Sequence, residues 1–598
     1  MLRCLTYPEQ VKNSPVSRAS KWSWVTVVVT CTVVASMPAV VSAWTTTSPQ
    51  INFATFGGAS SDQAYSVAVS ASGNVYTGGS FSGTADFDPD AGVTNLVSAG
   101  SSDAFVTKLD PSGNLVWVKQ LGGTVADVVR GVAVDAGGNV YASGSFSGTA
   151  DFDPGAGVTN LVSSGSNDAF VVKLDPSGAL VWARQFGAAS GDVSYSVTVD
   201  AGGNVYTVGS FQGTTDFDPG AGTSNLVSAG LNDVFVVKLD SAGDLVWAKS
   251  AGSASADVGY NVHVDGSGNV YSSGFFQSTA DFDPGAGTSS LTSTGLYDTF
   301  AWKLSSSGSL VWAKGWGGTG NEYAAGAALD SSGNYYTTGY FESVSDFDPG
   351  AGTASITPFG GTDAFISKID ANGNLVWARQ FGGTSFDFSA GVAVDQAGNV
   401  CSTGYFMGTA DFDPGAGTNN LSATGSTADI FVAKLNSAGE HVWAQSLNGA
   451  SGESGNATAF DSGGDCYVAG YYMGTVDFDP GAGVVNSTAA GGQDGFLVRF
   501  GNSGGTLVTT TTAAVATTSS TVVQSIASAN TPTTTVAAPT TTVPLAGSAA
   551  STNSAPVVTE DPGLPKSGPV MIWVQVIGAW LLLLSGTSLV RRARLMQR

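Results

Sequence analysis

The acidic motif Asp-Phe-Asp-Pro is the feature of this sequence with the clearest capacity for chemistry. It occurs seven times at intervals of 65 or 66 residues. In an extended chain its two aspartates point to one side and the Phe to the other. Two carboxylates about 4 Å apart repel each other by ~1 kcal/mol in water, so a cation or backbone donors should offset them.

Calcium is the natural cation for such a motif outside a cell, because it accepts six to eight oxygen ligands. The first copy is the most suggestive, since it adds a third aspartate at an alternate position. No other cofactor is indicated. The candidate Ca²⁺ ligands are Asp86, Asp88, Asp90, Asp151, Asp153, Asp216, Asp218, Asp281, Asp283, Asp346, Asp348, Asp411, Asp413, Asp477 and Asp479.

A second interpretation of the motif needs no metal. The aspartates would cap the Pro-Gly turn of a β-hairpin, whose returning strand is Asn160–Ser163 in the second copy. Phe152 would then plug into the core. Both interpretations stay open at the level of sequence.

Catalytic chemistry has weaker support. Paired carboxylates could act on glycosidic bonds, but an active site should break the repeat symmetry, and no copy gains a distinctive cluster of acids, bases and nucleophiles. His263 and His441 stand in different copies and replace apolar or small residues. A periodic series of tryptophans (Trp117, Trp182, Trp247, Trp312, Trp377 and Trp443) favours core packing over sugar stacking. We expect no catalytic residues and no enzyme.

The elements that must position these residues are short β-strands. In the second copy four segments rich in Val, Phe, Tyr or Trp are bounded by Gly, Asp, Asn or Ser, which is typical of strands. Two of the connections between these strands are tight turns. The 21-residue connection between the second and third strands (147–167) contains the Asp-Phe-Asp-Pro motif. The second-to-third and blade-to-blade connections emerge on one face, so the long material should crown that face.

Seven repeats of four antiparallel strands favour a β-propeller, because radial closure hides the sheet edges. The fold class is therefore all-β, a seven-bladed β-propeller of four-stranded antiparallel blades over residues 44–504. Ile51–Gly58 matches an outermost strand and should complete the last blade and close the ring; Thr506–Val508 is the alternative closing strand. A linear β-solenoid is the alternative fold.

The repeat resembles the bacterial SBBP-type β-propeller repeats, whose hallmark is similar to Gly-Val-Ala-Val-Asp-x-x-Gly-Asn-Val-Tyr-x-x-Gly-x-Phe. This chain has that pattern from Gly131 and, with Cys401 in place of Tyr, from Gly391. The resemblance implies the fold and a secreted or surface location, but little about activity.

The N-terminal segment predicts export. Residues 1–43 combine basic residues, an apolar run from Trp24 to Val41 and a small-residue end, which is typical of a signal peptide cleaved between Ala43 and Trp44.

The C-terminal segment, 564–598, resembles a sortase sorting signal of Gram-positive bacteria. Leu564, Pro565, Lys566, Ser567 and Gly568 precede an apolar stretch, 569–590, long enough for a transmembrane helix, and then a basic tail. The resemblance implies transient contact with sortase, cleavage after Ser567 and covalent attachment to peptidoglycan. Ser567 stands where the family usually has Thr, so a permanent single-pass anchor is the alternative.

Residues 505–563, between propeller and anchor, are dominated by Thr, Ala, Ser, Val and Pro. Such a segment cannot bury enough apolar surface to fold, so it should form a disordered stalk.

Charge narrows the partners. The chain has 22 basic and 46 acidic side chains and a net charge of −24. Between the two ends, every Lys and Arg except Arg130 recurs in predicted third or fourth strands. Without a free basic patch, nucleic acid is a poor partner, and the membrane is contacted only through the C-terminal helix before sorting. Cations, glycans and proteins remain as ligands.

Two cysteines remain in the mature chain. Cys401 and Cys466 are out of phase with the repeat, and on alternating strands their side chains face opposite sides. We therefore expect no disulfide between them.

The functional hypothesis is an exported, surface-anchored propeller of a Gram-positive-type bacterium that acts as a non-enzymatic binding or adhesion module. A glycan or protein ligand would bind through the long loops. The alternatives are a structural coat or spacer and an enzyme acting on polysaccharide.

Overall fold

The computed structural model describes residues 45–47, 51–90 and 92–501. All regular elements in these ranges are β-strands, and consecutive strands pair antiparallel into four-stranded units. The predicted all-β, propeller-like fold with antiparallel four-stranded units is confirmed. No helix long and apolar enough to cross a membrane occurs in the described ranges.

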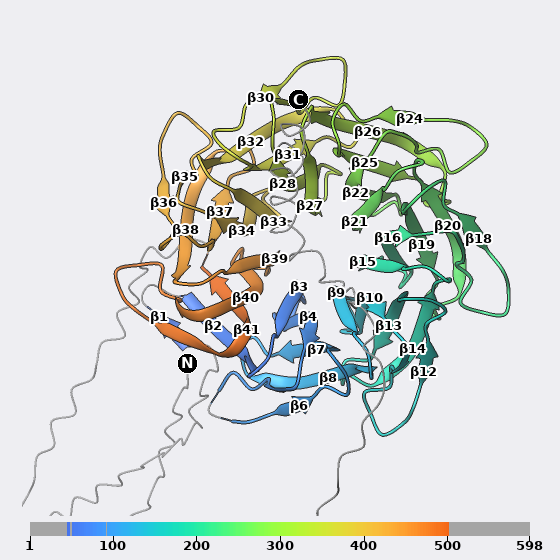
Figure 1. The fold of residues 1–598 in the computed structure, drawn as a ribbon, viewed down its shortest axis with the longest axis horizontal. Helices are drawn as coiled ribbons and strands as arrows, with labels where there is room; N and C mark the ends of the chain where they lie inside the picture. Colours follow the sequence, from blue (N-terminus) through green and yellow to red (C-terminus); the bar gives the residue numbers. More distant parts are fainter. Residues whose placement is uncertain (1–44, 48–50, 91, 502–598) are drawn as a thin grey trace, which may run out of the picture. The chain divides into compact units, whose positions relative to one another are not determined.

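Seven four-stranded units follow one another along the chain, and Figure 1 shows them arranged around a common centre. The first strand of each unit is innermost. These strands are β3 (Gln63–Val69), β9 (Val128–Val134), β15 (Val193–Val199), β21 (Val258–Val264), β27 (Glu322–Leu329), β33 (Asp387–Val394) and β39 (Ser454–Phe460).

The second and third strands form the buried middle of each unit. The second strands are β4 (Val75–Phe81), β10 (Val140–Phe146), β16 (Val205–Phe211), β22 (Val270–Phe276), β28 (Tyr335–Phe341), β34 (Val400–Phe406) and β40 (Cys466–Asp477). The third strands are β7 (Asp103–Leu109), β13 (Asp168–Leu174), β19 (Asp233–Leu239), β25 (Asp298–Leu304), β31 (Asp363–Ile369), β37 (Asp429–Leu435) and β41 (Asn486–Phe500).

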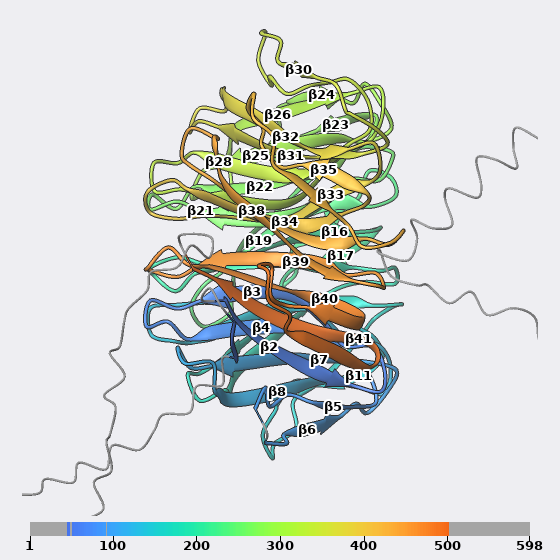
Figure 2. The same ribbon diagram turned by 90° about the vertical axis from the view of Figure 1, so that its left-hand side faces the viewer.

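The fourth strand of each unit is outermost. In the first six units these are β8 (Leu115–Gly123), β14 (Leu180–Phe186), β20 (Leu245–Ala251), β26 (Leu310–Gly318), β32 (Leu375–Gly383) and β38 (His441–Gly449). In the seventh unit the outer position is taken by β2 (Ile51–Gly58), which pairs antiparallel with β41 from Ile51 opposite Phe500 to Phe56 opposite Gly495 (Figure 2). The short β1 (Thr45–Thr47) pairs with β2.

The hydrophobic core lies between units rather than inside them. Seven clusters of buried side chains each combine residues from two consecutive units, and one of them joins the seventh unit to the first. In the cluster between the first two units, Tyr76 and Val106 of one pack with Phe146 and Phe170 of the next. A sheet of this kind buries both faces only when it has a neighbour on each side.

The long connection between second and third strands forms a hairpin that pairs with the preceding unit, through a strand ladder in five repeats and through an isolated bridge in the third and fourth. In the second repeat, β11 pairs with β8 of the first unit, with Ala150 opposite Gly123. A Cβ on Gly123 would lie 2.0 Å from the Thr149 carbonyl oxygen, so the Gly-Gly end of the outer strand admits the hairpin. The hairpin strands are β5 (Thr84–Asp86), β6 (Asn95–Val97), β11 (Thr149–Asp151), β12 (Asn160–Val162), β17 (Thr214–Asp216), β18 (Asn225–Val227), β23 (Thr279–Asp281), β24 (Ser290–Thr292), β29 (Ser345–Asp346), β30 (Ser355–Ile356), β35 (Thr409–Asp411) and β36 (Asn420–Ser422).

The returning hairpin strands β6, β12, β18, β24, β30 and β36 lie at the periphery in Figure 1. In the seventh repeat the same role falls to the end of β40 and the start of β41, where Asp477 lies opposite Asn448 of β38. The long connection between the second and third strands of each repeat therefore attaches one unit to the unit before it.

The prediction that Cys401 and Cys466 stay unpaired is wrong. They form a disulfide with a Cα–Cα distance of 6.5 Å. Cys401 lies on β34 of the sixth unit and Cys466 on β40 of the seventh. Adjacent units pack face to face, so side chains on opposite faces of their own sheets point into the same junction. The difference in phase that argued against the disulfide is what brings the two sulfurs together.

We predict that the exported, oxidised protein, which would lack Cys4 and Cys31 after removal of residues 1–43, contains no reactive thiol after denaturation, because Cys401 and Cys466 are paired. Replacing both residues by Ser should lower the unfolding free energy by about 3–5 kcal/mol, the range for closing a loop of this size. Thiol titration in denaturant and thermal unfolding measure the two effects. Two titratable thiols in the untreated protein would contradict the pairing.

Candidate functional site

The aspartates of the Asp-Phe-Asp-Pro motif lie where each hairpin turns. In the second repeat, Asp151 Oδ1 accepts hydrogen bonds from the backbone N–H groups of Asp153 and Thr159 at 3.0 and 2.8 Å. Asp153 Oδ1 accepts the N–H of Gly155 at 2.8 Å. The same three bonds recur in all seven copies.

The phenylalanine of the motif anchors the hairpin. Phe152 is 1% exposed and its ring centroid lies 5.3 Å from that of Phe146 and 4.8 Å from that of Phe170. The capped-hairpin interpretation is thus confirmed, with the predicted partner strand. No group of three or more His, Cys, Asp or Glu side chains arranged to hold a metal occurs in the described part of the chain. Calcium binding by these aspartates stays a prediction.

A second set of acids, which the sequence reasoning did not single out, lies buried between units. Asp103 begins β7 of the first unit, and Asp127 directly precedes β9 of the second. Their exposures are 0% and 1%. A Cβ on Gly122 would lie 2.7 Å from Asp127 Oδ2 and 3.0 Å from Asp103 Cγ, so the two carboxyl groups flank this glycine.

Equivalent pairs occupy all seven junctions. Besides Asp103 with Asp127, they are Asp494 with Asp62, Asp168 with Asp192, Asp233 with Asp257, Asp298 with Glu322, Asp363 with Asp387, and Asp429 with Glu453. The sequence signal was present in the regular spacing of these acids within the repeat, but their meeting across a junction depends on which strands are neighbours.

Burial raises the pKa of these acids. Desolvation, with a smaller contribution from Asp103, raises the pKa of Asp127 to about 7. Desolvation, followed by the Asp429 carboxylate, raises the pKa of Glu453 to about 9. Both carboxyl oxygens of Glu453 and Oδ1 of Asp429 are buried without a hydrogen-bond partner. The oxygens of Asp127 accept the N–H groups of Gly123 and Ser147. Asp103 Oδ1 is buried without a hydrogen-bond partner. One proton shared between the two carboxyl groups would offset their repulsion and supply a hydrogen bond between them.

The histidines are structural. His263 lies on β21, where burial lowers its pKa to about 4 and Nε2 lies 3.0 Å from the Ala327 carbonyl oxygen, to which it donates in the neutral tautomer. His441 lies on β38 with Nε2 near the Asn419 amide. The structure does not bring the two histidines together.

The recurring basic and tryptophan side chains join each unit to the next. Trp182 Nε1 donates to the Ser241 carbonyl at 3.2 Å, and Lys173 lies over the Tyr141 ring and reaches the same carbonyl. Corresponding Trp bonds start from Trp117, Trp247, Trp312 and Trp377. These residues are therefore committed to packing, as predicted for the tryptophan series.

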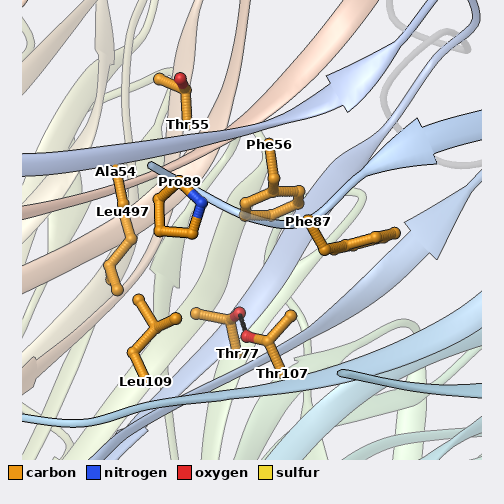
Figure 3. Close-up of a pocket in the computed structure, with 9 residues that line it drawn as sticks. All are labelled: Ala54, Thr55, Phe56, Thr77, Phe87, Pro89, Thr107, Leu109 and Leu497. Carbon is orange, nitrogen blue, oxygen red and sulfur yellow. Dashed lines mark hydrogen bonds between the residues drawn. The ribbon is translucent and has the colours of Figure 1, made fainter. Parts of the chain in front are cut away.

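A small cavity lies where β2 and β41 meet the first unit (Figure 3). Apolar side chains including Phe56, Phe87, Leu109 and Leu497 line it, with the hydrogen-bonded hydroxyls of Thr77 and Thr107. Its volume is about 10 Å³, which is at the lower limit for one water molecule. It cannot hold a substrate.

Arg130 is the exception among the basic residues. It lies on the innermost strand β9 at a β-bulge, because Val129 and Gly131 pair with Gly144 and Ser143 while Arg130 has no opposite residue. Its guanidinium lies 5.5 Å from the Tyr65 ring and 5.4 Å from the Tyr195 ring. Within the described ranges it forms no ion pair or hydrogen bond, and its Nε is buried without a partner. The same bulge occurs in all seven innermost strands, so it belongs to the repeat, and only the residue placed on it differs between units.

Aromatic residues continue from Arg130 around the centre. The ring centroids of Tyr195 and Tyr260 are 4.8 Å apart, those of Tyr260 and Tyr323 are 5.0 Å apart, and those of Tyr323 and Phe388 are 6.4 Å apart. Each of these side chains, and Arg130, is partly exposed. We call the set of Tyr65, Arg130, Tyr195, Tyr260, Tyr323 and Phe388 the central cluster.

The central cluster breaks the repeat symmetry. Tyr65, Arg130, Tyr195 and Tyr260 share one repeat position, which holds Ala325, Ala390 and Asn456 in the last three units. In the fifth and sixth units the aromatic residue stands two positions earlier. All members lie near the starts of innermost strands, at the end of each unit from which the hairpins also emerge. The sequence signal was the isolated position of Arg130, but its aromatic neighbours come from strands 65 or more residues away.

The remaining predicted functional residues lie outside the described ranges. They are Ala43 and Trp44 of the signal cleavage site, and Leu564, Pro565, Lys566, Ser567 and Gly568 of the sorting signal. The segments 505–563 and 569–590 lie outside them as well.

Comparisons with known proteins point to the same class of fold. Residues 181–217 match the SBBP β-propeller repeat model. A WD repeat-containing protein of Acanthamoeba polyphaga mimivirus is 25% identical over 418 residues, covering 59% of this chain and 30% of that protein. These matches support a β-propeller repeat protein.

A second curated relative is the regulatory protein FlaEY of Caulobacter vibrioides, which is 26% identical over 423 residues, covering 67% of this chain and 42% of the relative. The chain thus spans less than half the length of either relative. The crystal structure of Sqt1 from Chaetomium thermophilum aligns with a TM-score of 0.33 and 10% identity, over 73% of this chain and 84% of that one.

If the aspartates of the Asp-Phe-Asp-Pro motif bind calcium as predicted, millimolar Ca²⁺ should stabilise the hairpins beyond the backbone N–H groups that already bond to Oδ1 of Asp86 and Asp88. The absence of a calcium-dependent rise would contradict the prediction. The measurement is the thermal unfolding midpoint with millimolar Ca²⁺ and with chelator, in the natural protein and in Asp86→Ala. A ligand at 100 times its dissociation constant adds ~2.7 kcal/mol per site. A calcium-dependent rise that Asp86→Ala reduces would make the motif a metal site.

We predict that stability falls as pH rises from about 4 to about 9. A raised pKa means that the folded state binds more protons than the unfolded state, so the contribution is complete below the unfolded pKa and is lost as pH rises through the folded pKa. A pKa difference of one between the folded and unfolded states contributes about 1.4 kcal/mol to the free energy of unfolding. Thermal unfolding across this pH range measures the effect.

Glu453→Gln tests the assignment to the junction acids, because an amide can donate to Asp429 at every pH. It should raise the midpoint at pH 8 and flatten the profile, whereas the exposed control Glu440→Gln should leave the profile unchanged. A profile that rises towards pH 8 in the natural protein would refute the shared-proton assignment of these pairs.

Proposed function

We propose that the chain is a closed seven-bladed β-propeller, exported and displayed on the cell surface, that acts as a non-enzymatic binding module through the face carrying the central cluster. The observation that carries the proposal is Arg130 among aromatic rings, at positions where the repeats differ. Elsewhere the repeated polar residues serve the junctions between units. The β-propeller and WD-repeat relatives support a binding scaffold.

Ring closure is supported by two contacts between the ends of the repeat array. β2 supplies the outer strand of the seventh unit. Asn456 of that unit also donates from Nδ2 to the Ala64 carbonyl of the first unit at 2.8 Å. Closure would leave no sheet with a free apolar face.

A binding role is favoured over polysaccharide hydrolysis because the paired carboxylates are buried in the junctions. Asp103 and Asp127 are 0% and 1% exposed, so neither can reach a glycosidic bond in an extended polysaccharide. The hairpin carboxylates hold their own backbone turns. A purely structural coat or spacer would have no use for an uncompensated arginine at the centre.

Export and anchoring complete the proposal. The signal peptide would be cleaved between Ala43 and Trp44, and sortase would join Ser567 to peptidoglycan through the motif Leu564–Gly568. The Cys401–Cys466 disulfide supports an oxidising location outside the cytosol. The segment 505–563 would then act as a stalk between the wall and the propeller.

Replacing Leu564 and Pro565 by Ala should abolish covalent attachment, because these residues begin the motif that sortase would recognise. We expect the protein to move from the cell-wall fraction to the membrane fraction or the medium. Immunoblotting of fractionated cells measures this change. Replacement of Val558 and Thr559 by Ala, outside the motif, is the control. Unchanged attachment in the motif variant would show that the helix is the anchor.

The binding role predicts saturable capture of a glycan or protein from an array of surface molecules by the exported protein. Tyr260→Ala with Tyr323→Ala should weaken capture about tenfold or more, as expected when two stacked aromatic contacts are lost. The peripheral hairpin variant Val162→Ala should bind like the natural protein, since Val162 is 59% exposed and lies on β12 at the periphery (Figure 1). Capture that depends on Val162 and not on the tyrosines would place the binding surface on the hairpins.

A further inference from the structure

The central cluster contains a positive charge that the described chain does not neutralise. The other basic side chains of the described ranges lie on third or outer strands, and Arg130 is the one on an innermost strand. Three ion pairs are formed in these ranges, and all of them involve Arg184 or Arg499. A buried donor without a partner carries a cost that a ligand can remove.

The neighbouring rings orient this charge. Tyr65 and Tyr195 hold the guanidinium between them at 5.5 and 5.4 Å. Desolvation raises the pKa of Tyr260 well above its usual value, and Arg130 opposes this rise, so its charge acts across the cluster. Burial also raises the pKa of Tyr65, and the positive charge of Arg130 again opposes the rise. The protein therefore presents one cation, fixed by stacking, beside several aromatic faces.

We propose that the central cluster binds a sugar unit carrying a single carboxylate, such as a terminal hexuronate, with the carboxylate on Arg130 and the sugar ring on the adjoining tyrosines. This inference rests on the proposed binding function and names its ligand class. A guanidinium and a carboxylate match in a two-bond geometry. The apolar face of a sugar ring packs on aromatic rings, while its hydroxyls can bond to the Tyr hydroxyls.

The charge of the protein limits the ligand to few negative groups. A net charge of −24 repels polyanions such as nucleic acid or heavily sulfated chains. One carboxylate on an otherwise neutral sugar gains the short-range contact with Arg130 and meets little of this repulsion.

One recurring mode of peptide binding, the addition of a strand to a free sheet edge, is not open at the centre. Here the edges of the innermost strands are used between units. Val132 N donates to Ser66 Oγ at 3.0 Å, and the Ala325 carbonyl accepts from Asn261 Nδ2 at 3.1 Å. A ligand at the centre must bind through side chains, which suits a sugar.

The test is calorimetric titration of the exported protein with a glucuronate-terminated trisaccharide, its glucose-terminated counterpart of the same linkage, and a short acidic peptide. The variants are Arg130→Gln, Arg130→Tyr and the matched charge control Arg184→Gln. Tyr occupies the position of Arg130 in the first, third and fourth units, so Arg130→Tyr is compatible with the fold. Thermal unfolding of each variant monitors folding.

We expect the glucuronate probe to bind about tenfold or more tightly than the glucose probe, and this difference to vanish in Arg130→Gln and Arg130→Tyr but not in Arg184→Gln. Equal binding of the two sugars, or no binding of the acidic sugar at millimolar concentration, would overturn the inference. Preference for the acidic peptide would overturn it in favour of a peptide site. Array capture that depends on the tyrosines but not on Arg130 would leave the binding function standing while refuting this ligand.

Discussion

The junction between consecutive units is the constraint on which the rest of the structure depends. A four-stranded sheet with apolar residues on both faces is stable only when each face is covered, and here every core cluster is shared by two units. The hairpin of each repeat pairs with the preceding unit, by a strand ladder or by an isolated bridge. The Trp and Lys side chains of each unit reach into the turn of the next. Packing, strand addition and side-chain hydrogen bonds thus all act across the same boundary.

This constraint separates two kinds of residue. Those that repeat are committed to the junctions, and they include most of the polar groups that look capable of chemistry, such as the hairpin aspartates and the buried acid pairs. Residues that differ between repeats are not required at every junction. Arg130 and the aromatic residues around it belong to the second kind, which is why a repetitive protein can place an asymmetric cluster of side chains on its innermost strands.

The sequence was sufficient to predict strands, their order and the hairpin with its capping aspartates, because these depend on local patterns: alternation, turn residues and a fixed period. It was insufficient where distant strands meet. Cys401 and Cys466 were judged by the faces of a single sheet, whereas their pairing depends on two sheets facing each other. Asp103 and Asp127 are separated by an outer strand and meet only through the junction. For Arg130, the isolation among the basic residues was visible in the sequence, but not the bulge that turns it or the tyrosines on β3 and β15 that hold it.

The most direct test of a binding site at the central cluster is hydrogen–deuterium exchange of the exported protein, free and saturated with a glucuronate-terminated oligosaccharide. We predict slower exchange in the bound state at the starts of β3, β9, β15 and β21, with exchange in the peripheral hairpins unchanged. Slower exchange confined to the hairpins, or to the tight turns at the other end of the units, would contradict a site built around Arg130.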